Sequence, residues 1–145
     1  PQTLKVVVNI WRELADTALG IHIKYPPGWT AESNPTARTR IQSYSSSADE
    51  TEALAPNEVF IEVFTVPLSS NSNYPVRISE TESLSLAGIA AVRGFRTVAE
   101  VSPFPGYDMY VPLGDLLYIV AGSYDGSSAT ALQRIKLIQT SFRPF

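Results

Sequence analysis

The chain has 145 residues, of which 44% are hydrophobic and 10% aromatic, enough for one compact domain and too few for two. Its 11 Lys and Arg residues against 14 Asp and Glu residues give a net charge of -3, without the basic excess of nucleic-acid-binding domains, so no DNA or RNA partner is expected. The absence of cysteine excludes disulfides, thiolate-bound zinc, iron–sulfur clusters and a cysteine nucleophile, and the single histidine argues against an imidazole-rich metal site.

The first ten residues are interpreted as a tail or the end of a tether, followed by a single domain over residues 11–145. Because the sequence starts at Pro1, we expect a signal peptide, lipoprotein leader or membrane anchor upstream, and membrane contact only through it. No apolar run approaches the ~20 residues that cross a bilayer. The 16 serines and 11 threonines outnumber the charged residues, a balance typical of exported domains. The expected location is therefore extracytoplasmic: periplasm, cell surface or thylakoid lumen.

The first predicted elements lie between residues 11 and 29. Apolar residues in 11–18 recur at i, i+3, i+4 and i+7, the spacing of a helix face. After a turn at Gly20, residues 21–25 alternate between apolar and polar, as in a strand with one buried face. The Pro-Pro-Gly sequence at 26–28 ends this strand, and a positive φ at the glycine would let Trp29 fold back onto the apolar face.

The middle of the chain reads as strands separated by polar loops. Residues 30–40 are polar, and residues 41–44 could form a short strand before a serine-rich loop at 45–50. The clearest strand covers residues 59–66, which are β-branched and aromatic throughout, and ends at Pro67. Its nearly continuous apolar character predicts burial on both faces.

The second half predicts four more strands and a helix. The strands cover residues 78–86, 88–95, 107–111 and 115–124, the last two forming a hairpin joined by residues 112–114. A helix is predicted from about Ser128, with a capping hydroxyl at its start and apolar residues at 132, 135, 138 and 142 on one face. Arg143 is favourable near the carboxyl end of this helix, and Pro144 stops it.

The order of these elements resembles that of PsbP-like domains. The sequence LGIHIKYPPGW at residues 19–29 is similar to their entry motif of glycine, alternating strand and Tyr-Pro-x-x-Trp. The strand at 59–66, the AGIAA sequence at 87–91, the hairpin over 107–124 and the IQTSF sequence at 138–142 follow in the family's order. The resemblance covers the chain from about Trp11 to Phe145.

This resemblance implies an α+β fold, with an antiparallel β-sheet flanked by helices in an α/β/α sandwich and the C-terminal helix packed on the sheet. It also favours a strand near Trp11 and a turn at Asp16-Thr17 in place of the helix suggested by spacing, so both alternatives remain open. The stretch from Pro67 to Val76 is shorter than the helical connection that relatives often carry.

The resemblance further implies a function in docking. Family members include lumenal extrinsic subunits of photosystem II, bacterial exported domains and a nuclear import factor that binds a small GTPase, and most of them are not catalysts. We therefore expect a monomeric, non-catalytic domain without cofactors that docks to a membrane-associated, photosynthetic or exported protein. The metal positions of the photosynthetic members do not carry over, because His22 has no matching partner in this sequence.

Residues that could carry chemistry are few, and none forms a known motif. His22 shares the face of Lys24 on the predicted strand and is interpreted as a surface residue, since no serine or carboxylate lies at diagnostic spacing. The carboxylates at 49, 50 and 52 lack the spacing of a calcium loop, and those at 80 and 82 read as a solvent-facing stripe. The phosphate-binding glycine loops and the serine-hydrolase elbow are absent from the sequence.

The aromatic residues near the predicted hairpin suggest an alternative function. Phe104, Tyr107 and Tyr110, with Trp29, lie beside proline and glycine and could form a docking patch or a sugar-stacking platform. Aromatic residues of a small domain mostly fill its core, and Trp29 follows the family's buried pattern. We expect Tyr107 and Tyr110 to be the exposed exceptions, because their phenols tolerate water. The alternative is thus a small-ligand or glycan-binding module.

Overall fold

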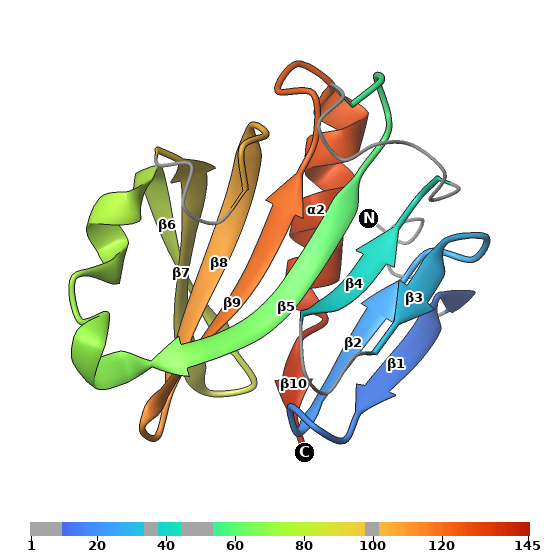
Figure 1. The fold of residues 1–145 in the computed structure, drawn as a ribbon. Coiled ribbons are helices and arrows are strands. Elements are labelled where there is room, and N and C mark those ends of the chain that lie inside the picture. The colour runs from blue at the N-terminus through green and yellow to red at the C-terminus, as the bar shows by residue number, and fades with distance from the viewer. Residues whose placement is uncertain (1–9, 34–37, 45–53, 98–101) are drawn as a thin grey trace.

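Across the residues that the structure describes, the fold consists of two antiparallel sheets and one α-helix (Figure 1). The computed structural model describes residues 10–33, 38–44, 54–97 and 102–145, so the predicted tail at 1–10 lies almost wholly outside the described residues. The elements are β1 (Arg12–Asp16), β2 (Ile21–Tyr25), β3 (Thr30–Glu32), β4 (Thr39–Gln42), β5 (Phe60–Pro67), β6 (Ile78–Leu86), β7 (Ile89–Arg96), β8 (Gly106–Leu113), β9 (Leu116–Ser123), α2 (Ala129–Thr140) and β10 (Arg143–Pro144). No helix in these ranges is both long and apolar enough to cross a membrane.

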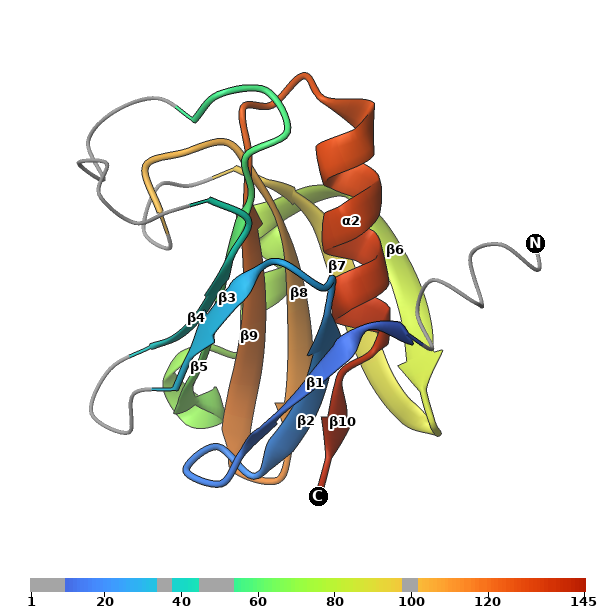
Figure 2. The ribbon, with the colours of Figure 1, turned by 90° about the vertical axis from the view of Figure 1, so that its right-hand side faces the viewer.

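The larger sheet has seven strands in the order β3-β4-β5-β9-β8-β7-β6. Strands β6 to β9 form a meander, and β5 pairs antiparallel with β9 over its full length. The smaller sheet has the order β1-β2-β10, so its middle strand pairs with segments from both ends of the described chain. Helix α2 and the smaller sheet lie on the same face of the larger sheet, and the main core lies between them and that face (Figure 2).

Helix α2 packs closely on strands β8 and β9. Ile135 lies against Gly122 of β9, where any side chain would collide with its Cγ2 atom. One turn further along, the buried Gln139 amide donates hydrogen bonds to the carbonyl oxygens of Tyr107 (2.9 Å) and Val120 (3.2 Å). A small residue on the sheet and a polar side chain on the helix therefore fix how the helix lies on the sheet.

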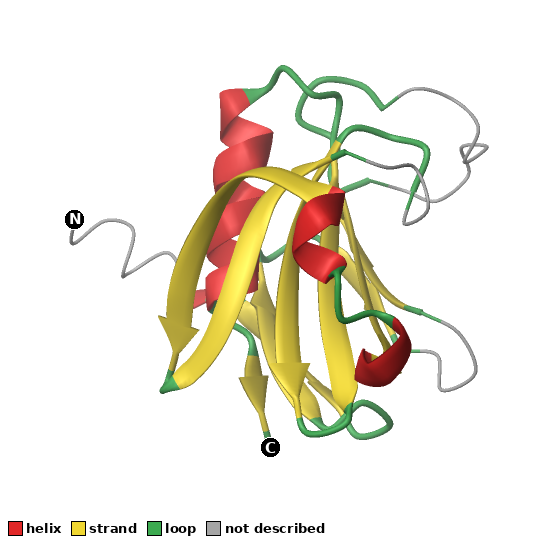
Figure 3. Ribbon diagram, turned by 90° about the vertical axis from the view of Figure 1, so that its left-hand side faces the viewer, coloured by secondary structure: helices red, strands yellow, loops and turns green. Residues whose placement is uncertain are grey.

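The opposite face of the larger sheet carries no α-helix within the described residues (Figure 3). Two 3-10 turns, Leu68–Ser70 and Tyr74–Arg77, lie over part of it and cover a second apolar cluster that includes Tyr110 and Ile119. The expected α/β/α sandwich is therefore wrong on this side. The connection from β5 to β6 is short, follows Pro67 at the end of β5 and carries Pro75. Both prolines restrict the backbone and lack an amide donor, so the connection forms single turns only.

A buried ion pair between β7 and β8 lies on the same face. The Arg96 guanidinium donates to both carboxylate oxygens of Asp108, at 2.8 Å and 2.6 Å, and to the carbonyl oxygen of Phe104 and the hydroxyl of Ser123. The Arg96 side chain is 3% exposed and that of Asp108 is fully buried. Burial raises the pKa of the Asp108 carboxyl, while the bonds and charge of Arg96 act in the opposite direction. Gly106 leaves the space that the guanidinium fills.

Asp16 joins the smaller sheet to the larger one. At the end of β1 its carboxylate accepts hydrogen bonds from the amide of Leu19 (3.0 Å), within the turn to β2, and from the hydroxyls of Ser33 (3.1 Å) and Thr39. Thr39 belongs to β4 of the larger sheet, so one buried side chain holds a turn and two sheets together. Burial alone would raise the pKa of Asp16, but these hydrogen bonds outweigh it and lower the pKa below its ordinary value.

Most of the predicted elements are confirmed. The strand over 59–66, those over 78–86 and 88–95, and the hairpin appear as β5 to β9, although Pro112 lies within β8 and the hairpin turns at Gly114-Asp115. The region 11–18 forms β1 followed by a turn, so the helix suggested by its spacing is wrong and the strand is right. Residues 30–32, expected to be loop, form β3 because they pair with β4. Ser128 caps α2 as predicted, but the helix ends at Thr140, before Phe142.

Candidate functional site

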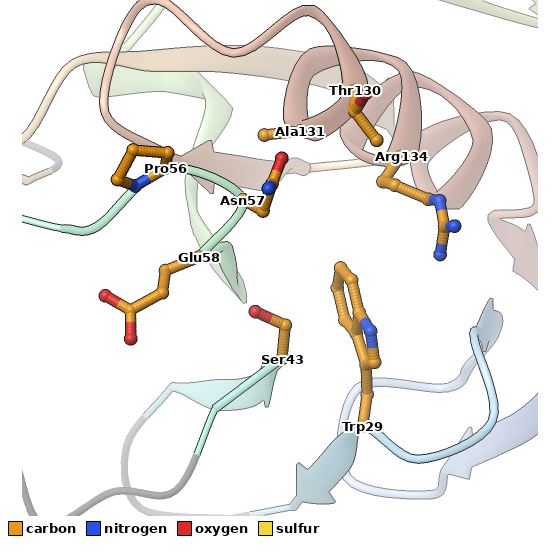
Figure 4. A pocket seen from close by; sticks show the side chains of 8 residues that line it. All are labelled: Trp29, Ser43, Pro56, Asn57, Glu58, Thr130, Ala131 and Arg134. Atoms are coloured by element: carbon orange, nitrogen blue, oxygen red, sulfur yellow. The ribbon is translucent and has the colours of Figure 1, made fainter.

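An open pocket of about 480 Å³ lies at the amino-terminal end of α2, between that helix, the end of β4 and the segment before β5 (Figure 4). The residues lining it come from four separate parts of the chain: Trp29, Ser43, Pro56, Asn57, Glu58, Thr130, Ala131 and Arg134. Its volume falls in the range of ligand-binding pockets, and a tryptophan and an arginine, the residue types most common at binding hot spots, lie on its walls.

A tight turn after β2 positions Trp29. The strand ends at Tyr25, and the following turn is closed by a hydrogen bond from the Trp29 amide to the Pro26 carbonyl oxygen (3.3 Å). Gly28 has a φ of +89°, which side chains rarely adopt, so the sequence of two prolines and a glycine returns the chain at this point. The indole is half-buried: it packs on the main core and also forms part of the pocket wall.

The opposite wall is the first turn of α2, tied to the segment before β5. The Ser128 hydroxyl caps the helix by accepting from the Ala131 amide (3.1 Å) and donates to the Asn57 side-chain oxygen (3.0 Å). Asn57 itself has a φ of +72°, a conformation that asparagine tolerates better than most residues. Asp125 accepts the backbone amides of residues 127 and 128, which lowers the pKa of its carboxyl. The wall is therefore formed before any ligand arrives.

The polar groups of the pocket are mainly unused donors. Within the described ranges, Arg134 is half-buried and makes no hydrogen bond or ion pair. Over the same ranges, neither the Trp29 indole N–H nor the Asn57 side-chain NH₂ has a hydrogen-bond acceptor. The Ser43 hydroxyl accepts from the Val59 amide (3.0 Å), which leaves its proton to donate, and the Glu58 carboxylate already accepts the Ala55 amide (2.7 Å). The pocket thus suits a ligand that supplies hydrogen-bond acceptors and negative charge.

The three residues predicted to bind a ligand are not brought together. Tyr107 and Tyr110 are 2% and 1% exposed, so the expectation that they face water is wrong. They are three positions apart on β8 and therefore point to opposite faces: Tyr107 lies in the main core, Tyr110 in the second cluster. Phe104 is half-buried and meets the ring of Phe60 edge to face, with centroids 5.6 Å apart. A binding role for these residues stays a prediction, but their rings do not form one platform.

The other chemically interesting residues are dispersed. His22 lies on β2 with Nδ1 3.5 Å from the Glu13 carboxylate, without the geometry of a hydrogen bond, and its ring packs against Phe145. Glu80 and Glu82 do not form a regular stripe, because β6 is bulged between Ser79 and Glu82. Across the four described ranges, no three His, Asp or Glu side chains are placed to hold a metal ion. The acidic residues at 49, 50 and 52 lie outside those ranges.

The pocket was not predicted from the sequence. Of its residues, Trp29 alone was discussed and was expected in the core, and no chemistry was assigned to Arg134. The residues lining the pocket are up to about a hundred positions apart, and no periodic pattern relates them. The useful local signals were the Pro-Pro-Gly turn before Trp29 and the serine cap that fixes where α2 begins.

Comparison with known proteins gives a fold and no closer relationship. No family model and no curated protein matches the sequence. Among solved structures, the chain is similar to the solution structure of cyanobacterial PsbP (CyanoP) from Synechocystis sp. PCC 6803, with 12% sequence identity, a TM-score of 0.50 and coverage of 92% of each chain. The fold is therefore PsbP-like, as the order of sequence motifs had predicted.

Proposed function

We propose that this protein is a non-catalytic extracytoplasmic domain that docks to a membrane-associated or exported protein. The observation that carries the proposal is the PsbP-like fold over 92% of the chain. It is supported by the sequence resemblance to a family whose members mostly act by docking, and by the serine- and threonine-rich composition.

The pocket at the start of α2 supports docking over catalysis. A tryptophan, and an arginine that has no partner among the described residues, suit the capture of a protruding group from a partner protein. Nucleophilic catalysis would need a nucleophile and a base within hydrogen-bond reach of each other. His22, the single histidine, lies on β2 and is not among the residues that line this pocket.

Crosslinking in native membranes tests the function. The domain carries a photo-crosslinker at an exposed position and is compared with an unrelated exported domain of similar size and charge. We expect one protein to be crosslinked in stoichiometric yield to this domain and not to the comparison domain. Finding no such protein, together with turnover of a small substrate by the purified domain, would reverse the proposal.

A further inference from the structure

We infer that the pocket between Trp29 and Arg134 receives a short acidic peptide segment of the docking partner, with a carboxylate on Arg134 and an apolar side chain against the Trp29 indole. The inference rests on the proposed docking function and adds to it the surface used and the chemistry of the segment bound. It follows from the polarity of the pocket, the state of Arg134 and the rigidity of the walls.

The state of Arg134 indicates an anionic ligand. A guanidinium keeps its charge at all physiological pH values, and its N–H groups match the two oxygens of a carboxylate. Among the described residues Arg134 has neither, whereas Arg93 and Arg96 both bond to carboxylates. The nearest acid on the pocket wall, Glu58, is held by the Ala55 amide on the other side. A carboxylate from a partner would complete the fork of Arg134 with two parallel hydrogen bonds.

The remaining donors favour a peptide. The Trp29 indole N–H, the Asn57 amide and the Ser43 hydroxyl can donate to backbone carbonyl oxygens, which an extended segment presents at regular intervals. The indole face offers apolar area to a neighbouring side chain. An inorganic anion would use Arg134 and leave the indole and the depth of a pocket of about 480 Å³ unused.

The preformed walls explain how a short segment could bind measurably. Ser128 joins the helix cap to Asn57, and the turn at Gly28 holds Trp29, so little side-chain ordering is required on binding. Most of the ordering cost then falls on the peptide. We expect dissociation constants for isolated peptides in the micromolar to millimolar range.

The test is a peptide titration followed by NMR. The probes are N-acetylated, C-terminally amidated hexapeptides that contain Asp or Glu beside Leu or Phe, matched peptides with Asn or Gln, and a free-acid series whose only carboxylate is the C-terminus. The expected result is saturable movement of the Trp29 indole N–H signal with acidic peptides, while the buried Trp11 signal stays unchanged. The two series show whether the carboxylate comes from a side chain or from a chain end.

Matched variants identify the residue responsible. Arg134→Gln should weaken acidic-peptide binding by about tenfold or more, since charge-assisted bidentate bonds are lost. Arg143→Gln makes the same change beyond the other end of α2 and should leave binding within about twofold. Arg134→Lys keeps the charge but cannot bind a carboxylate through two parallel hydrogen bonds, so its affinity for acidic peptides should lie between those of the wild type and Arg134→Gln.

Three outcomes overturn the inference. They are equal affinity for acidic and amide peptides, unchanged affinity for acidic peptides in Arg134→Gln, or tighter binding of the acidic oligosaccharide tri-galacturonate than of every acidic peptide. The crosslinking experiment separates this failure from that of the proposed function. If Arg134→Gln still crosslinks to the same partner in full yield, docking stands and the pocket is not its surface. If the wild-type domain crosslinks to no protein yet binds acidic peptides through Arg134, the docking function fails and the chemistry of the pocket stands.

Discussion

The buried pair of Arg96 and Asp108 gives the sharpest test of how this fold is held together. Asp108→Asn keeps the size of the side chain but replaces one accepting oxygen by an NH₂ group that faces the N–H groups of Arg96. The arginine then remains buried and charged without its counter-ion. Removing one partner of a buried pair costs about 3–5 kcal/mol. Because Arg96 keeps its bonds to Phe104 and Ser123, we expect the low end, about 3 kcal/mol.

The assay is urea unfolding followed by tryptophan fluorescence and circular dichroism. With a slope of about 1–3 kcal/mol per molar urea, Asp108→Asn should lower the midpoint by about 1 M or more. Strand β7 offers a comparison in which only the burial of the acid differs: Arg93, whose side chain is 10% exposed, pairs at 3.0 Å with Glu82, whose side chain is 49% exposed. Glu82→Gln should cost less, about 1 kcal/mol, because water reaches the pair from the side of Glu82 and Arg93 keeps its bonds to Lys136 and Thr140. Equal losses for the two variants would refute the argument that burial of the carboxylate makes the Arg96 pair critical.

Three more outcomes follow from contacts described above. Gly122→Ala should cost about 1–3 kcal/mol in urea unfolding, because its methyl group collides with Ile135, and the cost should shrink in an Ile135→Ala background; simple additivity of the two changes would contradict this contact. Ser128→Ala should cost about 1 kcal/mol by removing the cap of α2, whereas Ser128→Asp should retain most of the stability, and an unchanged midpoint for the alanine variant would show that the cap contributes nothing. For Asp16, whose pKa is lowered in the folded state, the stabilisation is present above the ordinary value of 3.8 and is lost as the pH falls through the lower, folded-state pKa. In Asp16→Asn, the free energy of unfolding should therefore fall less steeply between about pH 5 and pH 2 than in the wild type. An equally steep fall would show that other carboxylates cause the loss of stability in acid.

The local part of the fold could be predicted from sequence because its signals are local. Strand β5 has a continuous β-branched and aromatic run ended by Pro67, and α2 has a capping serine followed by apolar residues at helical spacing. Strand β3 was missed because its three residues have no pattern of their own and are extended by pairing with β4. In residues 11–18, two signals competed: helical spacing suggested a helix, and pairing with β2 decided for a strand.

The site was less predictable, for two different reasons. The opposite orientation of Tyr107 and Tyr110 was implied by their odd separation on a strand, so this error lay in the reading of the sequence. The pocket at Trp29 and Arg134 depends on how α2 docks against β8 and β9 and on where the chain passes before β5. Such packing between distant segments produces no pattern within a few consecutive residues of the sequence.

Because of the smaller sheet, this domain can finish folding only after nearly the whole chain has been synthesised. Strand β2 is flanked by β1, which directly precedes it, and by β10, whose Pro144 pairs with Ile21 across more than a hundred residues. The fully buried Phe142 lies just ahead of β10. A chain growing on the ribosome, or emerging from a translocation channel with its amino terminus first, holds β2 with one edge open until residue 144 arrives. Products that stop short of this point would expose an unpaired edge and an unfilled core, which chaperones and proteases recognise.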